Sequence, residues 1–182
     1  WAYAAAGHIS PSLFDALAEE AAVRGVADFK PQGVARTAWS FSFAGHRAPP
    51  LFDALAAVGA DQAADFHSAN LANTVWAFAM AKHSAPRLFA ALGDAAVVAA
   101  KAGEFNALEL ANLAWSFATV ESATSPTALY DAIAAASLER VQEFEPQQVG
   151  MMTWAFATQG VASPLLFEAL GRVSLFQAKW AT

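Results

Sequence analysis

The sequence predicts an all-α protein, a right-handed α-solenoid of helix-turn-helix repeats about 38 residues long, with four to five antiparallel helix pairs. The first observation is a regular spacing of tryptophan, because Trp1, Trp39, Trp76, Trp115 and Trp154 are 38, 37, 39 and 39 residues apart. Self-similarity at such a period indicates stacked repeats. The second observation is that apolar residues recur three to four positions apart, as they do on one face of a helix. The third is that apolar and polar residues do not alternate with the period of two that strands would show.

Two motifs alternate along the chain and define the repeat. One has a Phe ten residues before the Trp and ends in Trp-(Ala/Ser)-Phe, and it occurs at Phe29–Ala44, Phe66–Ala81, Phe105–Val120 and Phe144–Gln159. The other begins with Pro and continues to Leu-Phe-Asp-Ala-Leu or a close variant, and it begins at Pro11, Pro50, Pro86, Pro126 and Pro164. We therefore predict one domain with repeats at 11–45, 49–83, 86–122 and 126–161. Partial repeats at 1–7 and 164–182 suggest a fragment of a longer array.

The Pro-containing motif predicts the first helix of each repeat. Pro suits the first helical turn because its missing N–H is not needed there. Leu13, Phe14, Leu17 and Ala21 form one apolar stripe. An acidic residue recurs beside the core aromatic residue, and we expect it to stabilise the positive end of the helix. These residues are Asp15, Asp53, Asp131 and Glu168.

The Trp-containing motif predicts the second helix, which Gly45 and Gly160 end in two repeats. A helical wheel places a nearly constant apolar face opposite a variable one. The constant face combines the Phe two residues after the Trp with the Val or Leu five before it and the small residue four before it. Its members are Phe41, Phe78, Phe117 and Phe156; Val34, Leu71, Leu110 and Val149; and Ala35, Ala72, Ala111 and Gly150. We expect the tryptophans to pack with this core, and stacking platforms for bases are the alternative.

The opposite face changes from repeat to repeat and is rich in amides. Its positions three, six and seven residues before the Trp hold Arg36, Asn73, Asn112 and Met151; Gly33, Asn70, Glu109 and Gln148; and Gln32, Ala69, Leu108 and Gln147. A fixed core with a variable polar stripe is typical of a modular binding surface, although a solvated face has the same pattern.

The composition argues against several other classes of function. The net charge of −6 weighs against a phosphate-driven nucleic-acid binder and against adsorption to an anionic membrane. We find no nucleotide-binding, hydrolase or metalloprotease motif and no Cys, so we expect neither an enzyme nor a cofactor nor a small-molecule substrate. His8, His46 and His83 each follow a Trp by seven residues, but neighbouring repeats would hold them about 8–10 Å apart. One metal ion cannot bridge that distance.

Together the motifs F-x-P-Q-x-(L/V)-A-N-T-x-W-A-F-A and P-x-L-F-D-A-L resemble the octotricopeptide repeat family across essentially the whole chain. The repeats of FAST-kinase-domain proteins and of the mitochondrial RNA-editing substrate-binding complex are similar too. The resemblance implies paired helices in a superhelix that binds single-stranded organellar RNA in support of processing, stability or translation, in a chloroplast or a mitochondrion.

If RNA is the ligand, we expect two or three side chains of each repeat to contact one base. The predicted base contacts are Gln32, Arg36, Asn70, Asn73, Glu109, Asn112, Gln147 and Gln148. The predicted phosphate contacts are Arg36, Lys82, Arg87 and Lys101. The rival surface is the variable part of the first helices, with Glu19, Glu20, Arg24, Asp61, Gln62, Asp94, Glu139 and Arg140. The alternative function is a protein-interaction scaffold built on the same solenoid.

Overall fold

A computed structural model describes residues 2–8, 10–120 and 127–180, with side chains as far as residue 175. These residues form ten α-helices and two short 3-10 helices, and no strand occurs among them. The α-helices are α1 (Ala2–Ala5), α2 (Pro11–Arg24), α3 (Pro31–Phe43), α4 (Pro49–Asp61), α5 (Ser68–Met80), α6 (Pro86–Lys101), α7 (Ala107–Thr119), α8 (Thr127–Glu139), α9 (Pro146–Thr158) and α10 (Pro164–Trp180). The 3-10 helices are η1 (Ala63–Asp65) and η2 (Val141–Glu143). The predicted all-α solenoid is confirmed. The predicted helix start at Pro126 lies outside the described residues.

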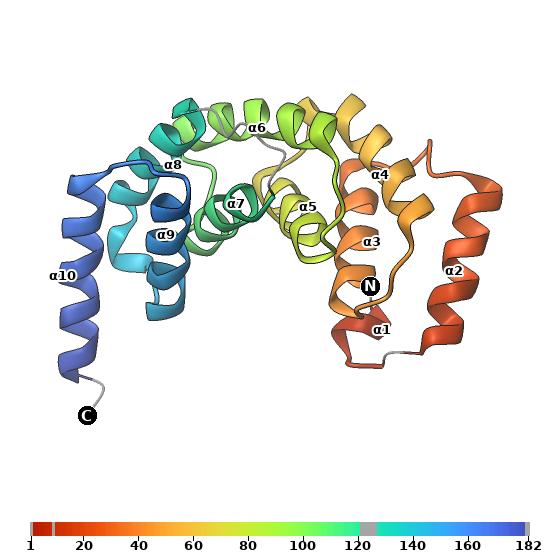
Figure 1. Cartoon of the computed structure of the whole chain (residues 1–182), viewed down its shortest axis with the longest axis horizontal. Helices are drawn as coiled ribbons and strands as arrows, with labels where there is room; N and C mark the ends of the chain where they lie inside the picture. The colour runs from red at the N-terminus through yellow and green to blue at the C-terminus, as the bar shows by residue number, and fades with distance from the viewer. Residues whose placement is uncertain (1, 9, 121–126, 181–182) are drawn as a thin grey trace.

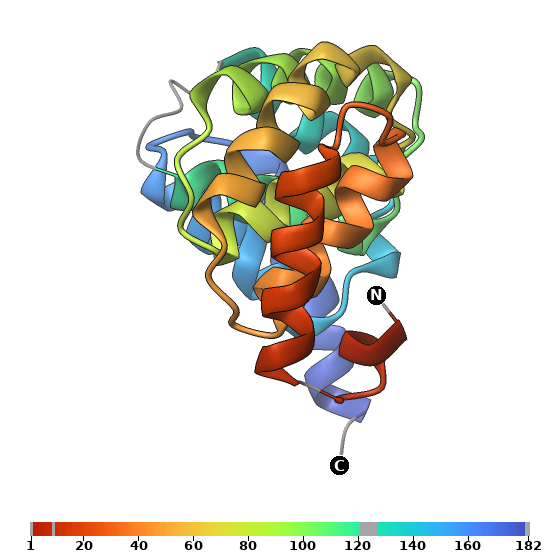
Figure 2. The ribbon, with the colours of Figure 1, turned by 90° about the vertical axis from the view of Figure 1, so that its right-hand side faces the viewer.

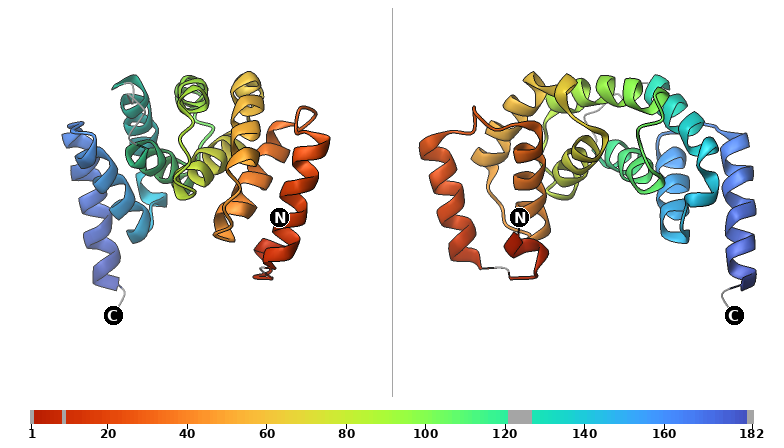
Figure 3. Two further views of the ribbon diagram at one scale, coloured as in Figure 1. Left: turned by 45° about the vertical axis from the view of Figure 1, so that its right-hand side comes forward. Right: turned by 180° about the vertical axis from the view of Figure 1, so that it is seen from behind.

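The helices form two layers that curve into an arch (Figure 1). The inner layer holds the Trp-containing helices, with α3 packed against α5, α5 against α7 and α7 against α9. The outer layer holds the Pro-initiated helices, with α4 packed against α6 and α6 against α8, while α2 and α10 stand at the two ends. The view along the arch and the view from behind show the same two layers (Figures 2 and 3). The inner layer therefore lines the concave side.

One aromatic contact recurs between the layers and closes each repeat. The Phe or Tyr of an outer helix meets the Phe that follows the Trp by two residues, edge to face, with ring centroids 5.0–5.2 Å apart. The pairs are Phe14–Phe41, Phe52–Phe78, Phe89–Phe117 and Tyr130–Phe156. All eight rings are at most 3% exposed. Such geometry adds about 0.5–1.5 kcal/mol per pair beyond the burial of the rings themselves.

The helix ends follow their sequence signals. Proline occupies the first turn of α2, α3, α4, α6 and α9, as expected from its fixed φ. At several C-termini the chain turns back through a residue in the left-handed region, and the N–H of the next residue donates a hydrogen bond to the carbonyl five residues before it. Gly7, Gly45, Gly103 and Gly160 take this position with φ of 64–73°. After α5 the position is taken by Lys82, with φ of 51°, at a cost of about 1–2 kcal/mol.

The placing of the tryptophans in the core is wrong in part. Trp39, Trp76 and Trp115 are half-buried, and Trp154 is 46% exposed. The remaining core prediction holds for three repeats, whereas in the last one Val149 is half-buried and Gly150 is exposed. On the first helix Leu17 is 49% exposed. The tryptophan lies about 100° or more from the centre of the buried face of its helix, so it covers the rim of the core rather than filling it.

The recurring acidic residues do not stand in a first turn, so their predicted role is also wrong. Asp15 and Asp53 lie one turn further along, and each is close to a histidine in the turn after the inner helix of its repeat, with a hydrogen bond between His83 and Asp53. Nε2 of His46 is 3.1 Å from Asp15, and Nε2 of His83 is 2.8 Å from Asp53. Both imidazoles rest against the aromatic pair of their repeat, with centroids 5.4–5.9 Å away. These histidines therefore contact both layers and connect them.

We expect Phe78→Ala to lower the free energy of unfolding by about 3–5 kcal/mol, because the ring is completely buried. Trp154→Ala should cost about 1 kcal/mol or less, because nearly half of that side chain is exposed. Urea denaturation followed by circular dichroism measures both. A loss for Trp154→Ala as large as that for Phe78→Ala would place the tryptophans in the core after all.

Candidate nucleic-acid interface

A continuous row of accessible side chains crosses the inner helices on the concave side. We call it the concave row and define it by four positions in each repeat: seven and three residues before the Trp, the Trp itself, and four residues after it. The row consists of Gln32, Arg36, Trp39, Phe43, Ala69, Asn73, Trp76, Met80, Leu108, Asn112, Trp115, Thr119, Gln147, Met151, Trp154 and Thr158. All sixteen are exposed or half-buried, because they point away from the outer layer. The row thus places the tryptophans beside the amides.

Predicted base-contacting residues of two repeats meet in one hollow between α3 and α5. This pocket of about 230 Å³ is lined by Gln32, Ala35, Arg36, Trp39, Asn70 and Asn73. Its wall includes the indole of Trp39, which stacks on Phe43 with centroids 4.7 Å apart and rings 11° from parallel. The hollow therefore offers an aromatic surface with amide and guanidinium groups beside it.

The acidic residues are segregated from this surface. Among the inner helices α3, α5, α7 and α9, the sole carboxylate is that of Glu109. The outer helices carry most of the others, namely Asp15, Glu19, Glu20, Asp53, Asp61, Asp94, Asp131, Glu139 and Glu168. The net charge of −6 is therefore mainly a property of the outer layer and does not describe the concave side. The overall charge is therefore a poor guide to the charge of this surface, contrary to the expectation from composition.

Two predicted base-contacting residues take part in helix capping. Glu109 accepts a hydrogen bond from the N–H of Asn106 at 3.0 Å, and the side chain of Asn106 accepts one from the N–H of Glu109 at 2.9 Å. In the last repeat Gln148 accepts from the N–H of Glu145 at 3.2 Å. The position six residues before the Trp is the third residue of its helix, where a side chain can reach back to the cap. By contrast, Asn73 and Asn112 make no side-chain hydrogen bond within the described part of the chain.

The predicted phosphate contacts do not gather in one place. Arg36 lines the hollow between α3 and α5. Arg87 forms an ion pair with Asp61, which joins two outer helices, and Lys101 ends the outer helix α6. Lys82 stands in the turn after α5. Arg36 and Lys82 are thus the two on the inner-layer side.

One protein family matches a large part of the sequence. The model of the RNA-editing substrate-binding complex 6 protein family matches residues 3–126, about two thirds of the chain. The chain belongs to this family. No curated protein matches the sequence. The match spans the first three full repeats, including the hollow around Trp39 and the capped start of α7.

The accessibility of the tryptophans is not among the sequence predictions, although the angular positions on the helical wheel indicate it. With the Trp at 0°, the residue three positions earlier lies at about 60° and the residue seven earlier at about 20°, whereas the core Phe lies near 200°. The Trp is therefore on the same side as the amides. The rival surface on the outer helices is in large part occupied by ion pairs, including Arg24–Glu20 and Arg140–Glu143.

No group of three or more His, Cys, Asp or Glu side chains in the described part of the chain could hold a metal ion. Within the same residues, we find no helix with the length and apolar character needed to cross a membrane.

The capping geometry predicts a difference between two variants of α7. Asn106→Ala should lower the free energy of unfolding by about 1 kcal/mol, because it removes the N-cap acceptor. Glu109→Gln should change it by less than about 0.5 kcal/mol, because glutamine also closes a capping box. Chemical denaturation of the two variants side by side measures the difference. Equal losses would show that the charge of Glu109, rather than its hydrogen bond, stabilises the helix.

Proposed function

We propose that this protein binds single-stranded RNA along the concave row, as a non-enzymatic component of an RNA-editing complex. The observation that carries the proposal is the hollow between α3 and α5. There Trp39 lies together with Gln32 and Arg36 of one repeat and with Asn70 and Asn73 of the next.

The chemistry of this hollow suits an unpaired base. An amide side chain has both donor and acceptor groups, so it can complement the edge of a base. A half-exposed indole offers a flat surface on which a base can stack, worth about 1–3 kcal/mol per base. Helical repeats that bind RNA use two or three side chains for each base, and two neighbouring repeats supply that number here.

The low charge of the concave side sets the kind of binding we expect. Few cations stand along the row, so only a few phosphates would be neutralised, and affinity should depend only modestly on salt. Each neutralised phosphate of a single strand contributes a slope of about −0.7 in a plot of log affinity against log salt. Base contacts and stacking would therefore provide most of the binding energy, which favours selectivity over general affinity for anions.

Family membership supports the biological setting of this proposal. The name of the family refers to a complex that binds RNA-editing substrates, so we propose that the chain acts in RNA editing, alongside other proteins and in the mitochondrion. Kinship with octotricopeptide repeats is a further proposal. It rests on the shared Trp-centred and Pro-Leu-Phe motifs.

A second candidate function is a scaffold for a protein partner. It is favoured by apolar members of the concave row, since Phe43, Met80, Leu108 and Trp154 are each 45–51% exposed. A partner helix or extended segment with apolar side chains could cover them. The same residues would equally suit stacked bases, so the amides between them favour RNA.

The RNA function predicts that Asn73→Ala and Asn112→Ala change which bases are selected from a random single-stranded RNA pool. Each replacement removes one donor–acceptor pair, so discrimination at one position should fall by about 1–3 kcal/mol, or roughly fivefold to 150-fold. Thermal stability should stay nearly constant, because Asn73 is exposed and Asn112 is half-buried. Sequencing of the bound pool at two salt concentrations measures selection and salt dependence together.

The matched control is Gln142→Ala, which removes an exposed amide in η2, outside the concave row. This variant should select the same sequences as the unmodified protein. If the unmodified protein selected no sequence and showed no salt-dependent binding, the RNA function would be contradicted and the scaffold function would take its place.

A further inference from the structure

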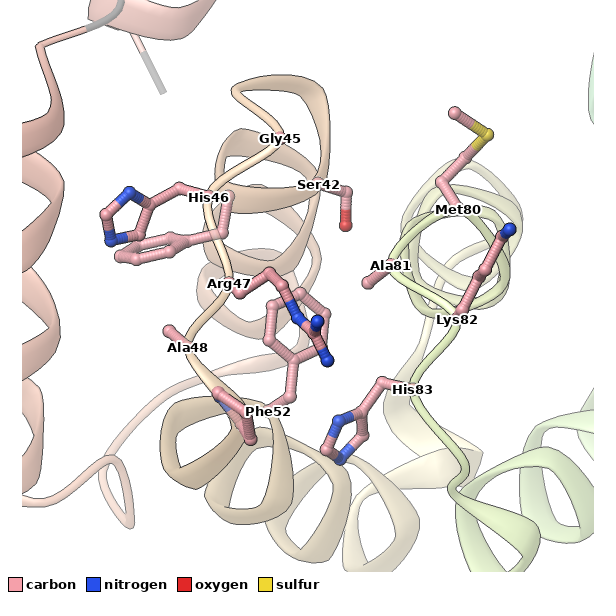
Figure 4. Close-up of a pocket in the computed structure, with 12 residues that line it drawn as sticks. Ser42, Gly45, His46, Arg47, Ala48, Phe52, Met80, Ala81, Lys82 and His83 are labelled. Atoms are coloured by element: carbon pink, nitrogen blue, oxygen red, sulfur yellow. The ribbon is translucent and has the colours of Figure 1, made fainter.

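A second hollow lies at one edge of the inner layer, between the turns that follow α3 and α5 (Figure 4). It has a volume of about 160 Å³. The turn after α3 contributes His46 and Arg47, and the turn after α5 contributes Lys82 and His83. Met80, a member of the concave row, also lines it, so the hollow adjoins the proposed path of the RNA.

The charged groups of this hollow are positive. No carboxylate is among the residues that line it. The acidic partners of the two histidines belong to the outer helices, where Nε2 of His46 is 3.1 Å from Asp15 and Nε2 of His83 is 2.8 Å from Asp53. Arg47 and Lys82 form no ion pair and no side-chain hydrogen bond with the described residues. In contrast, Arg24, Arg87, Arg140 and Arg172 each pair with a carboxylate.

The backbone at Lys82 provides an independent observation. In the four other described turns of this type the left-handed residue is glycine, at positions 7, 45, 103 and 160. Lys82 adopts the same left-handed φ although its side chain disfavours it. Residues in a strained backbone conformation often occur at functional sites, where a side chain has to be held in one position. Lys82 extends from this turn beside Met80 on the α5 side of the hollow, and Arg47 extends from the turn after α3 on the other side (Figure 4).

We infer that Arg47 and Lys82 bind one backbone phosphate of the RNA at this edge. The inference rests on the proposed RNA function and adds the site at which the strand leaves the concave row. Guanidinium and ammonium groups are the usual partners of phosphate oxygens. Six residues of helix separate Trp39 from Gly45, or about 9 Å along the axis, so a base stacked on Trp39 and a phosphate at the turn can belong to neighbouring nucleotides.

Helix stability alone offers another explanation for Lys82. A cation near the C-terminus of a helix interacts favourably with the negative end of its dipole. On that explanation, replacing the lysine weakens α5. On ours, glycine at this position relieves the strain and leaves the protein at least as stable, while the affinity for RNA falls.

The test uses the whole chain and a single-stranded RNA of the sequence selected from the random pool, with binding measured by fluorescence anisotropy at several salt concentrations. Lys82→Gly and Arg47→Ala should each lower the affinity about threefold to tenfold at low salt and reduce the salt slope by about 0.7. The midpoint of urea denaturation of Lys82→Gly should equal or exceed that of the unmodified protein. Lys82→Arg should retain binding, and Arg172→Gln, which removes a charge from α10 at the end of the arch, should leave it unchanged.

The possible failures are distinct. Binding by the unmodified protein together with equal binding by Lys82→Gly and Arg47→Ala would overturn this site and leave the RNA function standing. Absence of binding by the unmodified protein would overturn both. A loss of stability in Lys82→Gly without loss of affinity would assign the lysine to the helix dipole. A requirement for a 5′-phosphate on the oligomer would assign the hollow to a strand end and overturn the assignment to an internal phosphate.

Discussion

The edge-to-face contact between the two layers is the interaction on which the rest of the structure depends. In each repeat one outer ring, such as Phe52, meets the ring two residues after the Trp, such as Phe78. This contact fixes the rotation of the inner helix about its axis. Because the Trp lies about 160° from that Phe on the helix, fixing one residue directs the other toward the concave side. The packing that builds the solenoid thus also orients its candidate binding surface.

The same two-layer arrangement explains how an acidic protein can present a surface suited to RNA. Carboxylates gather on the outer helices, and several are used there for contacts between elements, such as Asp61 with Arg87 and Asp53 with His83. The inner helices carry amides, indoles and one carboxylate, that of Glu109, which takes part in the capping box of α7. A ligand on the concave side therefore meets little negative charge. The phosphates of the proposed RNA would meet cations mainly at Arg36 and at the edge formed by Arg47 and Lys82.

Much of the fold could be predicted from the sequence, because proline, glycine and the periodic aromatic residues act locally or repeat at a fixed interval. The candidate site was predicted less completely. The angular position of Asn73 on the helix predicts that it is exposed. Trp76 lies on the same side of the helix, but its hydrophobicity favours a place in the core. The capping role of Glu109 depends on its distance from the helix start, and the hollow at Lys82 depends on two turns that only the stacking of repeats brings together.

The central claim is that RNA lies along the concave row, and crosslinking tests it most directly. A single-stranded RNA carrying 4-thiouridine would be irradiated in complex with the whole chain, and the adducts located by mass spectrometry of peptides. We expect adducts on α3, α5 and α7, concentrated around Trp39 and Trp76, and none on α4 or α6. Adducts confined to the outer helices, with the inner helices unmodified, would contradict the claim.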